Sequence, residues 1–206
     1  IYIYYIIIMD TPYKIYCMGN VLVDKLSSYM STDNSTDIKA ERLVERNRGI
    51  FGSLYDLTYG STKIIDRLYL GNSCNARNYY DMREDNIGLI VNSSPCISNY
   101  FMKEFEYLNI DVKDISGANI LLHLDDTVYK MAEYISDNPT KNILVHCFMG
   151  SSRSATIIIA YLIKHHNYSL NDAMVYVKEK RMVVNLNKDF YTQLETFETE
   201  HKCRSM

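Results

Sequence analysis

Apolar and polar residues alternate along this chain in short blocks whose period changes from strand-like to helical. The apolar runs expected to form strands are short and bounded by turn residues, and they lie at 63–72 (strand, turn, strand), 87–94, 107–112 and 142–146. Between and after them, a short helix is expected at 75–86, and apolar residues at steps of three and four predict longer helices at 121–135, 155–164, 170–181 and 190–202. Strands that alternate with helices indicate an α/β fold, with a central, mostly parallel sheet of about 4–5 strands flanked by helices.

The chain divides into two regions of different composition. Residues 27–37 are rich in Ser, Thr, Asp and Asn, as loops and linkers are, and the spacing of apolar residues over 38–51 predicts a helix. The regular alternation begins only near Thr62. We therefore expect an N-terminal extension over 1–60, partly disordered apart from that helix, and a compact domain over 61–202.

The first nine residues, IYIYYIIIM, are apolar but have neither the basic segment nor the cleavage site of a signal peptide. Nine residues are also too few to span a bilayer. We expect them to precede the true start, at Met9 or Met18, and the alternative is a strand or a partner contact. A homodimer formed through the extension is one hypothesis for its role. No targeting signal is legible, so a cytoplasmic location is expected, with a viral origin and the host-cell cytoplasm left open.

Charge and cysteine content exclude several classes of function. The net charge of −3 gives no sign of a nucleic-acid partner or an anionic membrane. The five cysteines are odd in number and widely spaced, and no pair forms C-x-x-C, so neither a zinc cluster nor a disulfide framework is predicted. No metal or other cofactor is expected, and any anion site must be built locally.

A local anion site is predicted at HCFMGSSRS, residues 146–154, between a buried strand and the most apolar helix. A tight turn that leads into a helix directs several backbone N–H groups into one concavity, and the helix N-terminus adds positive potential. Gly150 lets the backbone turn sharply and approach a ligand closely. Arg153 supplies a planar guanidinium that suits two phosphate oxygens. The same field favours the thiolate of Cys147, which makes it a candidate nucleophile at the floor of the site.

The other residues of the loop have supporting roles in this interpretation. His146 is expected to hydrogen-bond to the loop backbone, and Ser154 to give its hydroxyl to the sulfur, while Ser151 and Ser152 can serve the turn alone. Taken singly, a Cys after an apolar strand is usually a small buried hydrophobe. A Cys, a Gly and an Arg inside one short turn favour chemistry instead. The absence of Lys from the loop excludes a nucleotide-binding P-loop.

The loop resembles the H-C-x-x-G-x-x-R-S signature of the cysteine-dependent protein tyrosine phosphatases, and within them the small (atypical) dual-specificity phosphatases. The similarity covers roughly residues 63–198 and includes LIVN at 89–92 and ILVHC at 143–147. Leu186 stands where the family usually has Pro, which implies at most a looser turn. The family's closing pattern R…N-x-x-F-x-x-Q-L is matched by Arg181, Asn187, Phe190, Gln193 and Leu194. The domain at 61–202 would then be a phosphatase catalytic domain.

The resemblance implies a two-step mechanism without a metal. Attack by the Cys147 thiolate on phosphorus gives a phosphocysteine, which water hydrolyses. The family takes its proton carrier from a loop upstream of the Cys, and Asp114 is the matching residue; Asp111 is the rival, because strand alternation could aim it at the same opening. Asn187 and His146 are expected to support the loop without touching substrate. The phosphate itself would be held by the loop backbone and side chains of Phe148, Met149, Gly150, Ser151, Ser152 and Arg153.

Phosphorylated protein is the preferred substrate, and phosphotyrosine against phosphoserine or phosphothreonine stays open. Relatives that act on phosphoinositides carry Lys between the Cys and the Arg, and this chain has none there. Relatives that act on RNA 5′-phosphates often have Thr after the Arg and a basic surface, whereas this chain has Ser154 and a negative net charge. A non-catalytic phosphoprotein-binding module is the alternative from another class.

Cys96 follows the apolar strand at 87–94 and raises one further hypothesis. It could approach Cys147 and protect it as a reversible disulfide. The favoured interpretation is an ordinary, partly buried loop thiol.

Overall fold

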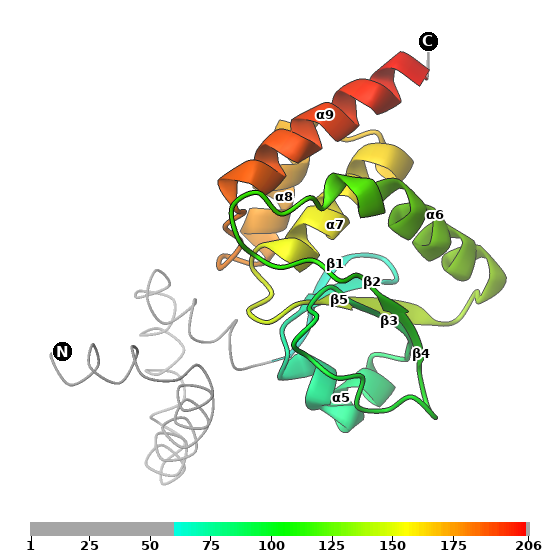
Figure 1. The fold of residues 1–206 in the computed structure, drawn as a ribbon. Coiled ribbons are helices and arrows are strands. Elements are labelled where there is room, and N and C mark those ends of the chain that lie inside the picture. The colour runs from blue at the N-terminus through cyan, green and yellow to red at the C-terminus, as the bar shows by residue number, and fades with distance from the viewer. Residues whose placement is uncertain (1–59, 205–206) are drawn as a thin grey trace, which may run out of the picture. The chain divides into compact units, whose positions relative to one another are not determined.

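A computed structural model describes residues 60–204 of the chain. Figure 1 shows a sheet with helices on both faces. The strands and helices, in chain order, are β1 (Thr62–Ile65), β2 (Leu68–Gly71), the 3₁₀ helix η1 (Asn75–Arg77), α5 (Tyr79–Glu84), β3 (Ile87–Asn92), β4 (Glu106–Asn109), α6 (Leu121–Asp137), β5 (Asn142–His146), α7 (Arg153–His166), α8 (Leu170–Lys180) and α9 (Lys188–Arg204).

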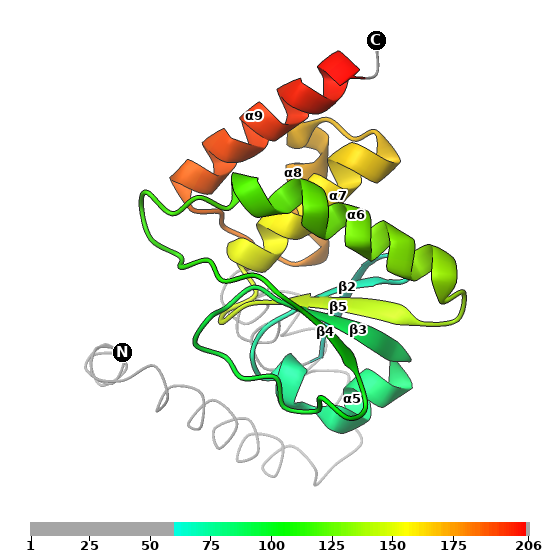
Figure 2. The ribbon, with the colours of Figure 1, turned by 45° about the vertical axis from the view of Figure 1, so that its right-hand side comes forward.

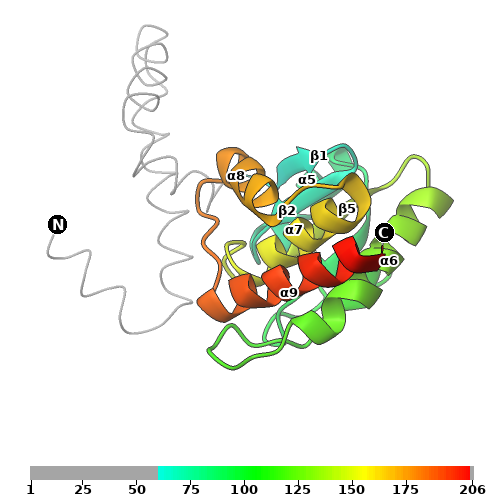
Figure 3. The same ribbon diagram turned by 90° about the horizontal axis from the view of Figure 1, so that it is seen from above.

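The sheet has five strands in the order β1-β2-β5-β3-β4. Strand β5 lies at its centre and pairs in parallel with β2 and β3, while β4 pairs in parallel with β3. Only β1 is antiparallel, to β2. Helices α6, α7, α8 and α9 cover one face of the sheet and α5 covers the other, as the turned and upper views show (Figures 2 and 3). The expected α/β fold with a mostly parallel sheet is confirmed.

The two faces of the sheet bury two separate hydrophobic clusters. Along β5, Ile143 and Val145 contribute to the larger cluster, and Leu144 between them contributes to the smaller one. This division follows from the pleat, because successive side chains of a strand point to opposite faces. Helix α7 runs through the larger cluster, and its residues from Arg153 to Ile163 are all buried. A strand and a helix buried in this way fix both ends of the loop between them.

Most predicted elements lie where the sequence pattern places them, and β5 coincides with the predicted strand at 142–146. The strand expected at 107–112 is shorter in the structure and ends at Asn109. Beyond it the Ile110 N–H bonds the Asn92 carbonyl at 2.9 Å, and the Val112 N–H turns back to the Ile110 carbonyl at 3.0 Å. The chain thus bends away from the sheet at the level where β3 ends.

Some expectations are not tested by this structure. The helix predicted at 38–51 and the linker at 27–37 lie outside the described residues, and the domain boundary near residue 60 stays a prediction. Within residues 60–204, no helix combines the length and apolar character needed to cross a membrane.

Candidate active site

The loop from Cys147 to Ser152 joins the C-terminal end of β5 to the N-terminus of α7. In open α/β sheets, ligands bind outside the carboxyl ends of the parallel strands. Since β5 is the central strand, its loop has neighbouring chain on both sides. The Ser73 N–H bonds the Phe148 carbonyl at 3.1 Å after β2, and the Ser93 N–H bonds the His146 carbonyl at 2.9 Å after β3.

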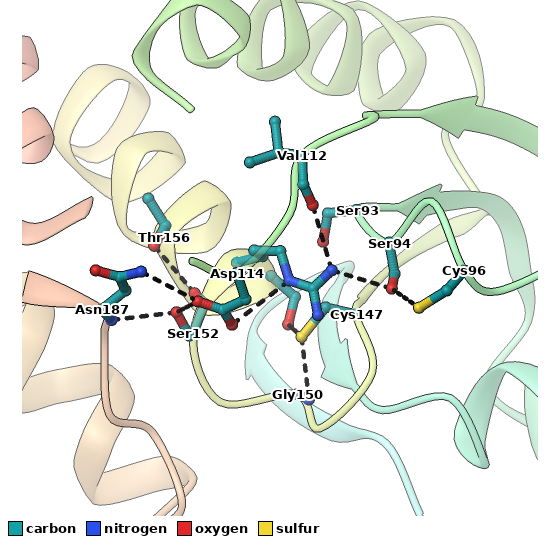
Figure 4. A network of polar contacts seen from close by, with 12 residues as sticks. Ser93, Ser94, Cys96, Val112, Asp114, Cys147, Gly150, Ser152, Thr156 and Asn187 are labelled. Carbon is teal, nitrogen blue, oxygen red and sulfur yellow. Dashed lines mark hydrogen bonds and ion pairs between the residues drawn. The ribbon is translucent and has the colours of Figure 1, made fainter. Parts of the chain in front are cut away.

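The Cys147 sulfur receives two hydrogen bonds from its own loop and helix. The Gly150 backbone N–H and the Ser154 hydroxyl each donate to Sγ at 3.2 Å. Figure 4 shows the Gly150 contact. Cys147 is 1% exposed, so these donors act on the sulfur with little competition from water. Two donors thus face the sulfur, which suits an atom that carries negative charge during a reaction.

The turn at Gly150 can be made only by glycine. Its φ of +69° lies in the left-handed region, and a Cβ there would stand 2.5 Å from the Gly71 carbonyl oxygen. The fully buried Arg181 side chain stabilises this turn. Its Nε donates to the Gly150 carbonyl oxygen at 3.1 Å, and its guanidinium also reaches the Thr62 hydroxyl at 2.9 Å. The turn at Gly150 is therefore fixed by Arg181 as well as by its own backbone.

The Arg153 guanidinium is held between two loops that follow neighbouring strands. One terminal nitrogen donates to the Ser94 hydroxyl at 3.0 Å and to the Val112 carbonyl oxygen at 3.3 Å. On the other side its Nε lies 3.5 Å from an Asp114 carboxylate oxygen. Figure 4 shows Ser94 and Val112 on one side of the site and Asp114 on the other. The side chain is 8% exposed, and these contacts fix the position of its charge.

The Asp114 carboxylate contacts the loop. Its Oδ1 accepts a hydrogen bond from the Ser152 hydroxyl at 3.0 Å and lies 3.5 Å from the Asn187 side-chain nitrogen (Figure 4). The Asn187 backbone N–H donates in turn to the Ser152 hydroxyl at 3.2 Å. The Asp114 side chain is 30% exposed, which leaves it open to solvent and to a substrate. A carboxyl group at this place can exchange protons with a group bound above the sulfur.

His146 is buried beneath the loop. Burial lowers its pKa from the ordinary 6.5 to about 4, and the nearby Arg153 charge acts in the same direction. Its Nδ1 lies 3.4 Å from the Cys147 carbonyl oxygen, a contact that the neutral ring can make with its N–H. The expected bond from His146 to the loop backbone is thus present.

The remaining predicted residues differ in their surroundings. Met149 is 41% exposed at the rim of the loop, and the Ser151 carbonyl accepts the Asn185 N–H at 3.0 Å. Asp111 is exposed, and its side chain makes no hydrogen bond or ion pair within the part of the chain that the structure describes. The rival position therefore lacks the contacts that join Asp114 to the loop.

Cys96 lies beside the site rather than in the loop. Its thiol is exposed, lies 3.3 Å from the Ser94 hydroxyl and forms no disulfide (Figure 4). The expectation of a partly buried thiol is therefore wrong: Cys96 follows the end of β3 and faces solvent. The hypothesis of a protective disulfide stays untested.

Sequence reasoning missed several contacts of the site. Ser94 and the Val112 carbonyl hold Arg153, and only the order of strands in the sheet brings them there. The one sequence signal for Ser94 was its place at the C-terminal end of the predicted strand at 87–94, the end where parallel strands carry ligands. Among residues 60–204, no group of three or more His, Cys, Asp or Glu side chains is placed to hold a metal ion.

Comparison with known proteins agrees with this geometry. The family described as "Dual specificity phosphatase, catalytic domain" matches residues 68–200. The protein phosphatase Slingshot of Drosophila melanogaster is 37% identical over 136 residues, which cover 66% of this chain and 13% of that protein. Human dual specificity protein phosphatase 16 is 38% identical over 146 residues, which cover 69% of this chain and 21% of that protein. The chain thus matches only a small part of these relatives' length.

Solved structures show the same fold. A mouse putative dual specificity phosphatase, complexed with zinc tungstate, superposes with a TM-score of 0.67 at 29% identity, covering 70% of this chain and 90% of that one. Human DUSP28 gives a TM-score of 0.65 at 28% identity, covering 68% and 93%. The fold and the Cys147 loop are those of the cysteine-dependent phosphatase class. The chain belongs to the dual-specificity phosphatase family, whose catalytic domain is matched by residues 68–200.

Proposed function

We propose that this chain hydrolyses phosphotyrosine and phosphoserine or phosphothreonine in proteins through a phosphocysteine intermediate. One observation carries the proposal above the rest. The Cys147 sulfur, the Arg153 guanidinium and the Asp114 carboxyl converge on one loop through the contacts of Ser154, Ser152 and Gly150. A nucleophile, a cation and a proton carrier in one place are the parts that phosphoryl transfer requires.

In the first step the Cys147 thiolate attacks phosphorus and the bond from phosphorus to the leaving oxygen breaks. Asp114 gives its proton to that oxygen. In the second step Asp114 takes a proton from water, the water oxygen bonds to phosphorus, and the phosphorus–sulfur bond breaks to return the thiolate. Arg153 and the backbone N–H groups of residues 148–153 stabilise the equatorial oxygens throughout. Ser154, already bonded to the sulfur, eases its departure.

Phosphorylated protein is the substrate class that the family match supports. The exposed Met149 at the rim adds no charge, and the loop has no cation other than Arg153 to hold a second phosphate. Phosphoinositide and RNA 5′-phosphate are therefore disfavoured, and a module that only binds phosphoproteins would not need the Asp114 contacts. We place the enzyme in the cytoplasm, with residues 61–202 as its catalytic domain.

The test is hydrolysis of p-nitrophenyl phosphate, followed by a panel of phosphopeptides, a phosphoinositide and an RNA 5′-triphosphate. We expect a burst of p-nitrophenol that Cys147→Ser abolishes, and turnover of phosphopeptides above the other two. Asp114→Asn should lower the rate on a tyrosyl phosphate by about 10²–10⁴-fold while phosphate still binds. Asp111→Asn is the matched control, and a loss in that variant alone would transfer the role to Asp111. Phosphopeptide binding without any turnover would overturn the enzyme assignment.

A further inference from the structure

The segment that carries Asp114 is anchored to α9 rather than to the loop alone. Asp189 lies in the first turn of α9, and its Oδ2 accepts hydrogen bonds from the Gly117 N–H at 2.7 Å and from the Ser116 hydroxyl at 2.8 Å. Both partners lie two and three positions after Asp114. The sequence pattern did not single out Asp189.

The anchored segment is a tight turn with little other support. The Ala118 N–H bonds the Ile115 carbonyl oxygen at 3.2 Å, and Gly117 has a φ of +79°, the value required at the third position of a type II turn. Ile115 is 57% exposed, and among the described residues a Cβ on Gly117 would meet no atom within 4 Å. A turn without packed neighbours depends on its polar bonds for a fixed position.

Asp189 is also linked to Asp114 through Asn187. Its backbone N–H donates to the Asn187 side-chain oxygen at 3.0 Å, and the Asn187 side-chain nitrogen lies 3.5 Å from Asp114. Further along α9, Gln193 accepts the Ile120 N–H at 2.8 Å and donates to the Ala118 carbonyl at 2.9 Å. Residues 116–121 are thus held by α9, and Asp114 is held by Asn187, the residue just before that helix. Asp189 is the side chain of α9 that bonds the turn itself.

We propose that Asp189 is a positioning residue that fixes the Asp114 turn over the Cys147 loop for proton transfer to the leaving group. The inference rests on the proposed function, since it takes Asp114 as the acid. The charge of Asp189 stays the same near neutral pH, which suits a residue that only positions another. The Gly117 N–H, followed by the Ser116 hydroxyl, holds the pKa of its carboxyl below the ordinary value, so it remains charged at neutral pH.

The test compares kcat/KM on two substrates, because this ratio reports formation of the phosphocysteine. Phenyl phosphate has a basic leaving oxygen that needs a proton, and 2,4-dinitrophenyl phosphate has an acidic one that does not. We expect Asp189→Asn to lower kcat/KM about 10- to 100-fold on phenyl phosphate, a part of the roughly 10²–10⁴-fold effect of general acid catalysis. On dinitrophenyl phosphate the change should stay within about twofold, because the loop and Arg153 are untouched.

The matched control is Asp172→Asn, an acidic residue in the first turn of α8 that also accepts a Ser hydroxyl, from Ser169 at 2.6 Å. It removes the same charge from a helix N-terminus and should leave kcat/KM unchanged on both substrates. Ser116→Ala removes one of the two bonds to Asp189 and should give a smaller loss in the same direction. It also carries the test if Asp189→Asn does not fold.

A double variant separates this inference from the proposed function. In an Asp114→Asn background, Asp189→Asn should add no further loss on phenyl phosphate, because the group that it positions is already gone. An equal loss on both substrates, or the same loss in both backgrounds, would overturn the positioning role. If the single variant Asp114→Asn kept the wild-type kcat/KM on phenyl phosphate, Asp114 would not be the acid. The inference, which rests on that assignment, would then lose its basis.

Discussion

The Ser154 hydroxyl donates to the Cys147 sulfur at 3.2 Å from the first turn of α7. Ser154 is fully buried, so this bond to the sulfur has no competition from water. It acts whenever the sulfur is anionic, which includes its departure from a phosphocysteine. The bond therefore bears on the second chemical step more than on the first.

We predict that Ser154→Ala slows hydrolysis of the phosphocysteine and leaves its formation nearly intact. A hydrogen bond to a charged group contributes about 1.5–3 kcal/mol, so kcat should fall roughly 10- to 100-fold. Rapid-mixing measurements should show a larger burst before a slower steady state. Ser169→Ala, which removes the cap of α8, is the control and should leave kinetics unchanged. Loss of the burst together with turnover would show that Ser154 acts earlier.

The fixed geometry of Arg153 gives a second prediction. Its guanidinium bonds both Ser94 and the Val112 carbonyl while facing Asp114, and a lysine ammonium is a point charge that cannot keep this arrangement. Arg153→Lys should lower kcat by on the order of 10²–10³-fold and weaken inhibition by vanadate. The exposed Arg83→Lys on α5 is the control. Unchanged vanadate inhibition would show that Arg153 does not bind the phosphoryl oxygens.

The loop could be predicted from the sequence because its residues are neighbours in the chain. The apolar run before Cys147 and the apolar helix after Arg153 place both ends of the turn, and local spacing then defines the chemistry. Even the bond from Ser154 to the sulfur joins residues only seven apart in the chain. The assignment of Asp114 needed the family resemblance as well, since it lies 38 residues before its partner Ser152.

The partners of Arg153 could not be predicted, because they depend on which strands lie side by side. Ser94 is 59 residues away and reaches Arg153 only because β3 pairs with β5. The anchor at Asp189 depends on how α9 packs over the sheet. An acidic residue at a helix start is expected on electrostatic grounds alone, so nothing in the pattern distinguished Asp189 from Asp172.

A third prediction concerns the turn at Gly150. Gly150→Ala places a Cβ at a φ of +69° and 2.5 Å from the Gly71 carbonyl oxygen. Strain of about 1–2 kcal/mol and overlap of about 1–3 kcal/mol should add, and the displaced turn should abolish activity. Gly60→Ala is the matched control, since Gly60 has a φ of +53° and an added Cβ would meet no atom of residues 60–204 within 4 Å. In this control the free energy of unfolding should fall only by the cost of the backbone strain, as measured by urea unfolding. Equal losses in both variants would show that the contact with Gly71 is not important.

The buried His146 should make the domain sensitive to acid. Its pKa is about 4 in the folded protein and about 6.5 when the chain unfolds, so below pH 6.5 the unfolded state binds the extra proton. The stability that comes from keeping His146 neutral is fully present above pH 6.5 and is lost as the pH falls toward 4. One pKa unit corresponds to about 1.4 kcal/mol, and the loss should be roughly 3 kcal/mol over this window. Urea unfolding at pH 7, 5.5 and 4.5 measures it. His146→Gln should flatten this dependence, and the exposed His123→Gln should not. The same slope in both variants would place the titration elsewhere.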